Sequence, residues 1–219
     1  EGIERNLAIK VLAQVARASD HAHQRGIIHR DLKPGNILIE RKTHNARITD
    51  FGLARDLSRG TRLTQVGQAV GTPYYMAPEQ VRGERDVDGR CDLYAIGVIL
   101  YEILTGDVPF DADSPLSLFK KIDREEVYLP LDPENGIDEN IHKIVMRALE
   151  KDREERYSRG NLLAEDLERY LEGLAPKAQP YAWREGLQRR LLSNPWTLAA
   201  IALAAVALGV LGVLGTVAS

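Results

Sequence analysis

The sequence predicts a mainly α-helical domain with a small β-hairpin, which is an α+β arrangement, followed by a linker and one transmembrane helix. Apolar side chains recur at helical spacing over residues 7–25, and residues 91–105 are nearly all apolar. Residues 196–218 carry no charge and consist mostly of Ala, Leu, Val and Gly. As a helix this last stretch would extend about 34 Å, enough for a hydrocarbon layer of about 30 Å.

The elements before the linker follow from local signals. The first helix is expected to close at Gly26, because glycine favours the left-handed conformation that ends many helices. Two short β-type runs, at 37–39 and 47–49, flank a polar tip and predict a hairpin. The helix at 91–105 is apolar on most sides and should therefore lie in the middle of the domain.

The remaining segments complete the predicted organisation. Helices are expected at 115–122, 138–150 and 161–172. Residues 173–195 contain three prolines and several arginines, which is typical of a linker. The predicted boundaries are 1–172 for the folded domain, 173–195 for the juxtamembrane linker and 196–218 for the transmembrane helix.

Composition excludes some classes of function. The 29 basic and 32 acidic side chains nearly balance, so nucleic acid is not an expected partner. The single cysteine, Cys91, rules out an internal disulfide and fits a reducing compartment, where it is expected to be a buried apolar side chain. His21 and His23 lie two positions apart on a helix and point to different faces, so a metal site is not expected there.

Three polar side chains lie close together after the first predicted helix. Asp31, Lys33 and Asn36 supply a carboxylate, an ammonium and an amide within one short loop. Such a group could accept a hydroxyl proton, neutralise a phosphoryl oxygen and bind Mg²⁺. For three polar residues alone, a solvated loop is the favoured interpretation.

The complete string His29-Arg30-Asp31-Leu32-Lys33-Pro34-Gly35-Asn36 resembles the catalytic loop of eukaryotic-type (Hanks-type) protein kinases. Asp50-Phe51-Gly52 resembles the magnesium motif of that family, and Ala77-Pro78-Glu79 resembles the motif that closes its activation segment. Each tripeptide alone is a weak signal. The three motifs in this order and at family spacing are a strong one, and the resemblance covers about residues 1–172.

The resemblance implies an active site for phosphoryl transfer from ATP with Mg²⁺. Asp31 would be the catalytic base, and Lys33 would stabilise charge on the transferred group. Asn36 and Asp50 would hold the magnesium ions that bridge the nucleotide phosphates. Lys33 and the threonine of Gly71-Thr72-Pro73 are similar to the serine/threonine branch, in which Thr72 would contact Asp31 and Lys33; the alternative is that Thr72 is only a turn residue.

The resemblance also implies supporting contacts. Asp92 would accept hydrogen bonds from the catalytic-loop backbone, although an acidic residue is also favoured near a helix N-terminus. Arg156 would pair with Glu79, and His29 would pack beneath the Asp50 turn. Arg30 would meet a phosphorylated residue of the activation segment, for which the candidates are Ser58, Thr61 and, as first choice, Thr64.

The family's Gly-rich loop, strand lysine and helix glutamate are not found before residue 27. We therefore expect the chain to hold the larger, C-terminal lobe of the kinase fold without the small N-terminal lobe, and residues 1–219 alone to turn over ATP weakly or undetectably. The competing hypotheses are a pseudokinase that binds nucleotide without transfer and a non-catalytic membrane scaffold.

The basic residues Arg184, Arg189 and Arg190 precede the predicted span, which favours a cytoplasmic kinase part by the positive-inside rule. The order of domain, linker and single span is similar to bacterial membrane-anchored, receptor-type kinases. Expected partners are protein substrates with Ser or Thr acceptors, ATP and the lipid bilayer. Glycines 209, 212 and 215 raise the further hypothesis of a homodimer through a close helix contact.

Overall fold

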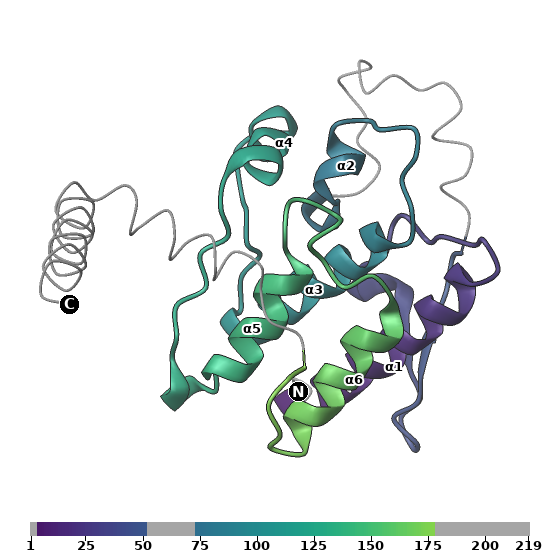
Figure 1. Cartoon of the computed structure of the whole chain (residues 1–219), viewed down its shortest axis with the longest axis vertical. Coiled ribbons are helices and arrows are strands. Elements are labelled where there is room, and N and C mark those ends of the chain that lie inside the picture. Colours follow the sequence, from purple (N-terminus) through teal and green to yellow (C-terminus); the bar gives the residue numbers. More distant parts are fainter. Residues whose placement is uncertain (1–3, 52–72, 178–219) are drawn as a thin grey trace, which may run out of the picture. The chain divides into compact units, whose positions relative to one another are not determined.

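The computed structural model describes residues 4–51 and 73–177, which form a helical domain with one small hairpin (Figure 1). The helices are α1 (Arg5–His23), α2 (Pro78–Val81), α3 (Arg90–Thr105), α4 (Pro115–Arg124), α5 (Glu139–Ala148) and α6 (Gly160–Leu171). The strands are β1 (Ile37–Ile39) and β2 (Ala46–Ile48), and short 3-10 turns lie at Pro34–Asn36, Pro73–Tyr75 and Pro133–Asn135. The predicted mainly α-helical fold is confirmed.

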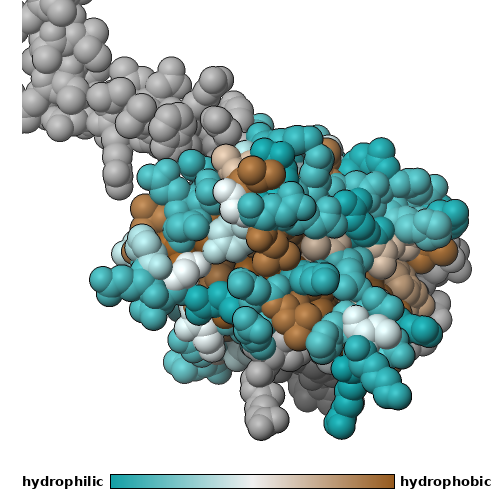
Figure 2. Space-filling view, turned by 90° about the horizontal axis from the view of Figure 1, so that it is seen from below, coloured by the Kyte–Doolittle hydropathy of each residue, from teal (hydrophilic) through white to brown (hydrophobic). Residues whose placement is uncertain are grey.

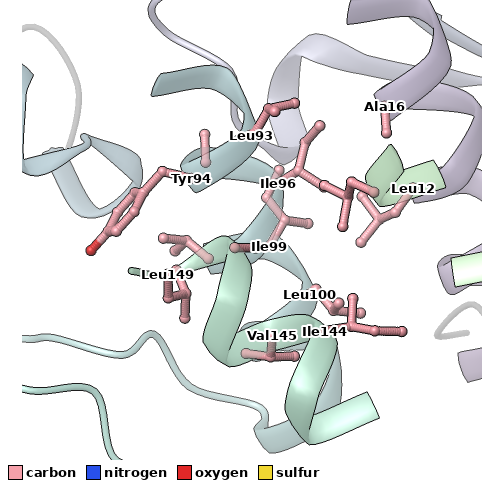
Figure 3. Packing of buried hydrophobic residues seen from close by; sticks show 14 of the residues in the cluster. Leu12, Ala16, Leu93, Tyr94, Ile96, Ile99, Leu100, Ile144, Val145 and Leu149 are labelled. Carbon is pink, nitrogen blue, oxygen red and sulfur yellow. The ribbon is translucent and has the colours of Figure 1, made fainter. Parts of the chain in front are cut away.

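Helix α3 lies at the centre of the domain, as its apolar sequence predicts. Figure 3 shows its side chains between those of α1, including Leu12 and Ala16, and those of α5, including Ile144. Ile96 and Leu100 of α3 are fully buried. Full burial of such a side chain stabilises the fold by about 1.5–3 kcal/mol, so this packing contributes to the stability of the elements that carry the site.

Glycines follow α1 and α3, and the one after α1 is the Gly26 that the sequence predicts. Gly26 follows α1 with φ of +72°, and Gly106 follows α3 with φ of +85°. These are left-handed conformations that glycine adopts without the steric cost of a Cβ. Gly26 lies three residues after the end of α1 and before the loop that carries Asp31.

Helix α6 packs closely against α1. A Cβ at Gly160 would lie 2.2 Å from the carbonyl oxygen of Ala16, so glycine is required at this approach. Next to it, Arg159 donates to the buried Asp20 carboxylate over 2.9 Å. The close contact and the ion pair together fix the first turn of α6 on the side of α1.

The hairpin is anchored to α1 by one glutamine. Strands β1 and β2 pair antiparallel, with Ile37 opposite Ile48. The second strand begins at Ala46 rather than at the predicted residue 47, because the register places Ala46 opposite Ile39. The Gln14 side chain donates to the carbonyl oxygen of His44 over 3.2 Å and accepts from the Ala46 amide over 2.8 Å.

Several predictions fall on residues that are not described. Thr64, Thr72 and the segment 196–218 are among them, as is most of the linker. Within residues 4–51 and 73–177, none of the helices has the length and apolar character needed to cross a bilayer. Cys91 is described and is buried, as predicted.

The surface of the domain is mixed in character. On the face in Figure 2, hydrophilic side chains predominate and apolar groups lie in patches between them. Among the large apolar side chains that are exposed over the domain, Leu38 and Phe51 belong to the segments next to the predicted magnesium ligands.

Candidate active site

The loop between α1 and β1 carries the predicted catalytic string and is held from below by α3. The Asp92 carboxylate, only 1% exposed, accepts the backbone amides of His29 and Arg30 over 2.9 and 2.8 Å. Its Oδ2 also lies 2.7 Å from His23 Nε2 of α1. Asp92 therefore makes the backbone contact that the resemblance implies. Three polar partners satisfy this buried carboxylate, which fixes the loop relative to α3.

Asp31 and Lys33 form an ion pair on the open side of the loop. Lys33 Nζ lies 2.7 Å from Asp31 Oδ2, and the two side chains are 33% and 56% exposed. Exposed ion pairs contribute little to stability, so neither side chain is committed to this contact. Both groups are free to turn towards a substrate.

Asn36 is oriented by its neighbours. The side-chain nitrogen of Asn36 donates to the backbone carbonyl oxygen of Asp31 over 2.8 Å. The backbone carbonyl oxygen of Asn36 accepts the Thr49 amide over 2.9 Å. Because the Asp31 carbonyl can only accept, the amide nitrogen must point there. Oδ1 of Asn36 is then the atom that can ligate a cation.

Asp50 lies at the end of β2 in a strained turn that His29 supports. Asp50 has φ of +61°, which is uncommon for a residue with a Cβ. The buried His29 ring donates from Nε2 to the Thr49 carbonyl over 2.8 Å and meets the Phe51 ring edge-on, with centroids 5.0 Å apart. His29 thus lies beneath the Asp50 turn, where the resemblance places it.

These contacts bring the predicted ligands together through Thr49. The Thr49 amide contacts Asn36, its carbonyl contacts His29, and its hydroxyl donates to Asp50 Oδ2 over 3.3 Å. The site therefore combines two carboxylates and an amide oxygen with an ammonium. Magnesium prefers such hard oxygen ligands, so the donor set fits Mg²⁺.

Glu79 and Arg156 form the predicted pair, in a fully buried setting. Both nitrogens at the end of the Arg156 guanidinium lie 2.7 Å from a Glu79 oxygen, and the side chains are at most 1% exposed. The carbonyl oxygens of Arg90, Glu150 and Lys151 accept the other three donors of Arg156. Every donor of the arginine is used, which offsets the cost of burying its charge.

The 3-10 turn at Pro73–Tyr75, which precedes α2, is hydrogen-bonded to other parts of the domain. Tyr75 donates its hydroxyl to Glu102 of α3 over 2.8 Å, and Tyr74 donates to Asp111 over 3.0 Å. Burial, together with the bond to Glu102, raises the pKa of Tyr75. Tyr75 is therefore a neutral donor at physiological pH, and the segment before α2 is held on α3.

Arg30 directly precedes Asp31 in the sequence, and one of its side-chain nitrogens has no hydrogen-bond partner among the described residues. Its Nε is buried, and within residues 4–51 and 73–177 nothing accepts its proton. Thr64, the residue predicted to meet Arg30 when phosphorylated, lies outside the described residues.

The sequence analysis did not single out Leu38, an exposed apolar residue close in sequence to Asn36. Leu38, the second residue of β1, is 56% exposed, whereas Ile37 and Ile39 on either side are partly buried. The alternation along a strand, together with the position two residues after Asn36, is the signal that could have found it.

The helical core, the hairpin and the clustered motif residues define a protein-kinase-like domain. The family model for the protein kinase domain matches residues 1–167, and the chain therefore belongs to the protein kinase family.

Its relatives agree with this assignment. The serine/threonine-protein kinase PknB of Mycobacterium leprae is 42% identical over 171 residues, covering 78% of this chain and 27% of that protein. PknB of Mycobacterium tuberculosis is 39% identical over 188 residues, covering 85% and 30%. A probable serine/threonine-protein kinase of Clostridium acetobutylicum is 38% identical, covering 75% and 25%. The chain thus spans between a quarter and a third of the length of these curated relatives.

A solved structure shares the fold. The crystal structure of Rad53 residues 1–466 in complex with AMP-PNP matches with a TM-score of 0.59 and 29% sequence identity. The match covers 78% of this chain and 41% of the Rad53 chain.

Proposed function

We propose that this chain is part of a serine/threonine protein kinase, which transfers the γ-phosphoryl group of ATP to Ser or Thr hydroxyls of proteins. One observation carries the proposal: the exposed Asp31–Lys33 pair lies in the same hydrogen-bonded unit as Asn36 and Asp50. Catalysis of phosphoryl transfer consists largely of positioning and charge stabilisation, and this unit offers groups for both.

Each residue has a distinct role in the proposed reaction. Asp31 orients the acceptor hydroxyl and takes its proton, and Lys33 turns from Asp31 to an oxygen of the transferred phosphoryl group. Asn36 and Asp50 would hold magnesium, which supplies charge neutralisation at the nucleotide phosphates. The exposed apolar side chain of Leu38 offers a contact for the flat base of the nucleotide.

The comparisons support the substrate class. The curated relatives are named serine/threonine-protein kinases, and the Rad53 structure is a complex with an ATP analogue. Thr72 would help to shape the acceptor site beside Asp31 and Lys33. The proposed cofactors are therefore ATP and Mg²⁺, and the proposed substrates are proteins.

We further propose that the described domain corresponds to the C-terminal lobe of the kinase fold. The support is its helical content and the position of the catalytic loop directly after α1. The Gly-rich loop and the strand lysine that cover the phosphates belong to the other lobe in this family. Residues 1–219 alone are accordingly expected to show weak or undetectable phosphotransfer.

Regulation and location are part of the same proposal. The guanidinium of Arg30, with a buried Nε that has no hydrogen-bond acceptor among the described residues, suits a phosphorylated Thr64, since a phosphate adds roughly −1.5 to −2 charge. The uncharged segment 196–218 supports a single-pass anchor in the cell membrane with the kinase part in the cytoplasm. Phosphopeptide mapping of the active protein and its recovery in the membrane fraction test these two points.

The substitution Asp31→Asn tests the proposed activity. In the longest natural protein that contains this chain, it should lower phosphotransfer to a protein substrate at least about 10³-fold, because the amide cannot accept the hydroxyl proton. The matched control is Asp86→Asn, since the exposed Asp86 side chain pairs with Arg153 at the same 2.7 Å separation. The control should keep wild-type activity.

The alternative functions give different results in the same experiment. A non-catalytic scaffold would transfer no phosphate in wild-type form. A pseudokinase would bind ATP, measured by calorimetry, without transfer. Wild-type activity that survives Asp31→Asn would contradict the proposed role of Asp31.

A further inference from the structure

The residue before Asp31 has an unfavourable backbone conformation. Arg30 has φ of +67°, in the left-handed region that residues with a Cβ rarely occupy. Such conformations persist only where the surrounding structure determines them. The orientation of Asp31 depends on this residue, because the two share a peptide bond.

Side chains from other parts of the domain hold the backbone around this residue. The amide of Arg30 donates to Asp92, as described above. The carbonyl oxygen of Arg30 accepts Nε2 of Gln80 over 2.7 Å, and the Asp31 amide donates to His29 Nδ1 over 3.3 Å. Both polar groups of the Arg30–Asp31 peptide bond are therefore bound, one to Gln80 and one to His29.

Gln80 is a residue of α2, and its amide makes two contacts of opposite kind. Oε1 accepts the Ala77 amide over 3.0 Å, while Nε2 donates to the Arg30 carbonyl. Since one partner can only donate and the other can only accept, the orientation of the amide is fixed. A glutamate could not donate to Arg30, and an apolar side chain could do neither.

The support beneath Gln80 is rigid. The preceding residue, Glu79, is held by Arg156 in the fully buried ion pair. The backbone of α2 is therefore fixed relative to the helical core. A side chain that extends from it to Arg30 can transmit that rigidity to the catalytic loop.

We propose that Gln80 is a positioning residue for catalysis: it holds the Arg30–Asp31 peptide bond in its strained orientation and so places the carboxylate of Asp31. The inference rests on the proposed kinase function for its catalytic consequence. Its structural part, the restraint of the loop, is independent of that function.

The substitution Gln80→Met tests the inference in the longest natural protein that contains this chain. Methionine keeps the length of the side chain and removes both hydrogen bonds. Gln14→Met is the matched control, because Gln14 bridges a carbonyl and an amide of the hairpin tip in the same way. Both variants lose two hydrogen bonds, but only one loses them at the catalytic loop.

The expected result is a fall in kcat of roughly 10- to 100-fold for Gln80→Met, with KM for ATP nearly unchanged, because small misplacements of a catalytic group are costly. Gln14→Met should keep the wild-type kcat. Equal kcat values for the two variants, at equal thermal stability, would overturn the catalytic part of the inference.

Hydrogen exchange measured by mass spectrometry on residues 28–36 supplies a readout without activity. Gln80→Met should speed amide exchange in this peptide, and Gln14→Met should not. Unchanged exchange in Gln80→Met would overturn the structural part of the inference. An inactive wild-type protein in which Gln80→Met still loosens the loop would contradict the proposed function and leave the positioning contact supported.

Discussion

Two carboxylate–cation pairs in this domain share a separation of 2.7 Å and differ in almost everything else. Glu79 and Arg156 are at most 1% exposed, and every donor of the arginine has an acceptor. The side chains of Asp31 and Lys33 are 56% and 33% exposed and make one contact with each other. The first pair cannot exchange its partners without leaving a charge buried, whereas the second can exchange them at little cost.

The difference separates structural support from reactivity. The buried pair anchors α2, from which Gln80 reaches the catalytic loop. The exposed pair lies on that loop, where its groups can contact nucleotide and acceptor. In the proposed function, stability and catalysis would depend on chemically similar pairs in opposite surroundings, and substitutions in the two pairs should have separable effects.

Breaking the buried pair should have the largest effect. Glu79→Gln leaves the Arg156 charge buried without a counter-charge, and we expect the free energy of unfolding to fall by about 3–5 kcal/mol. Chemical denaturation followed by circular dichroism measures this value. Glu168→Gln is the control, because Glu168 pairs with Arg17 on the surface. A loss for Glu79→Gln no greater than that of the control would contradict the comparison.

Breaking the exposed pair should lower phosphotransfer and leave stability nearly unchanged. Lys33→Met is expected to lower phosphotransfer about 10²- to 10³-fold, because the charge that stabilises the transferred group is gone. The free energy of unfolding should change by less than about 1 kcal/mol. Lys143→Met, which removes the exposed pair of Lys143 with Glu139, should affect neither quantity. A large loss of stability in Lys33→Met would show that the exposed pair is structural after all.

A third ion pair, between Asp20 and Arg159, adds a pH dependence to the comparison. Burial alone would raise the pKa of Asp20, but hydrogen bonds from Arg159 and Gln24 outweigh it and lower the pKa. The unfolded state then binds more protons, so the stabilisation is present above the ordinary aspartate value of about 3.9 and is lost as pH falls through the lowered native value.

The variant Asp20→Asn should therefore lower the melting temperature by a few degrees at pH 7. Below about pH 4 the difference from wild type should shrink, because the unfolded wild-type chain takes up a proton there while the native carboxylate, with its lowered pKa, is still ionised. Thermal melts at several pH values measure this difference. A constant difference from pH 3 to pH 7 would contradict the assignment of the stabilisation to the charged carboxylate.

The sequence carried most of the information on the site and on the order of helices. Local periodicity and glycine positions predicted α1, α3, α4, α5 and α6, since both depend on neighbouring residues, but they did not predict the four-residue helix α2. Glu79 and Arg156 could be paired from the family resemblance, although they lie 77 positions apart. The two-residue spacing of His21 and His23 predicted separate faces but not the contact of His23 with Asp92.

Gln80 and Leu38 show why the remainder could not be predicted. Gln80 follows a known motif, but its importance depends on the orientation of the Arg30 carbonyl, which only the folded backbone defines. Leu38 belongs to a run of three apolar residues, and the exposed member of such a run depends on the register and covering of the hairpin. Tertiary contacts decide the orientation of both side chains; for Leu38 the strand alternation was a local signal, whereas for Gln80 there was none.

The central claim is that Asp31, Lys33, Asn36 and Asp50 converge on magnesium-bound ATP. A crystal structure of the protein that contains this chain, with Mg²⁺ and a non-hydrolysable ATP analogue, tests it most directly. We predict that Asn36 Oδ1 and an Asp50 carboxylate oxygen each lie about 2.1 Å from a magnesium ion, with Asp31 facing the γ-phosphate. A nucleotide-bound metal that contacts neither Asn36 nor Asp50 would contradict the account.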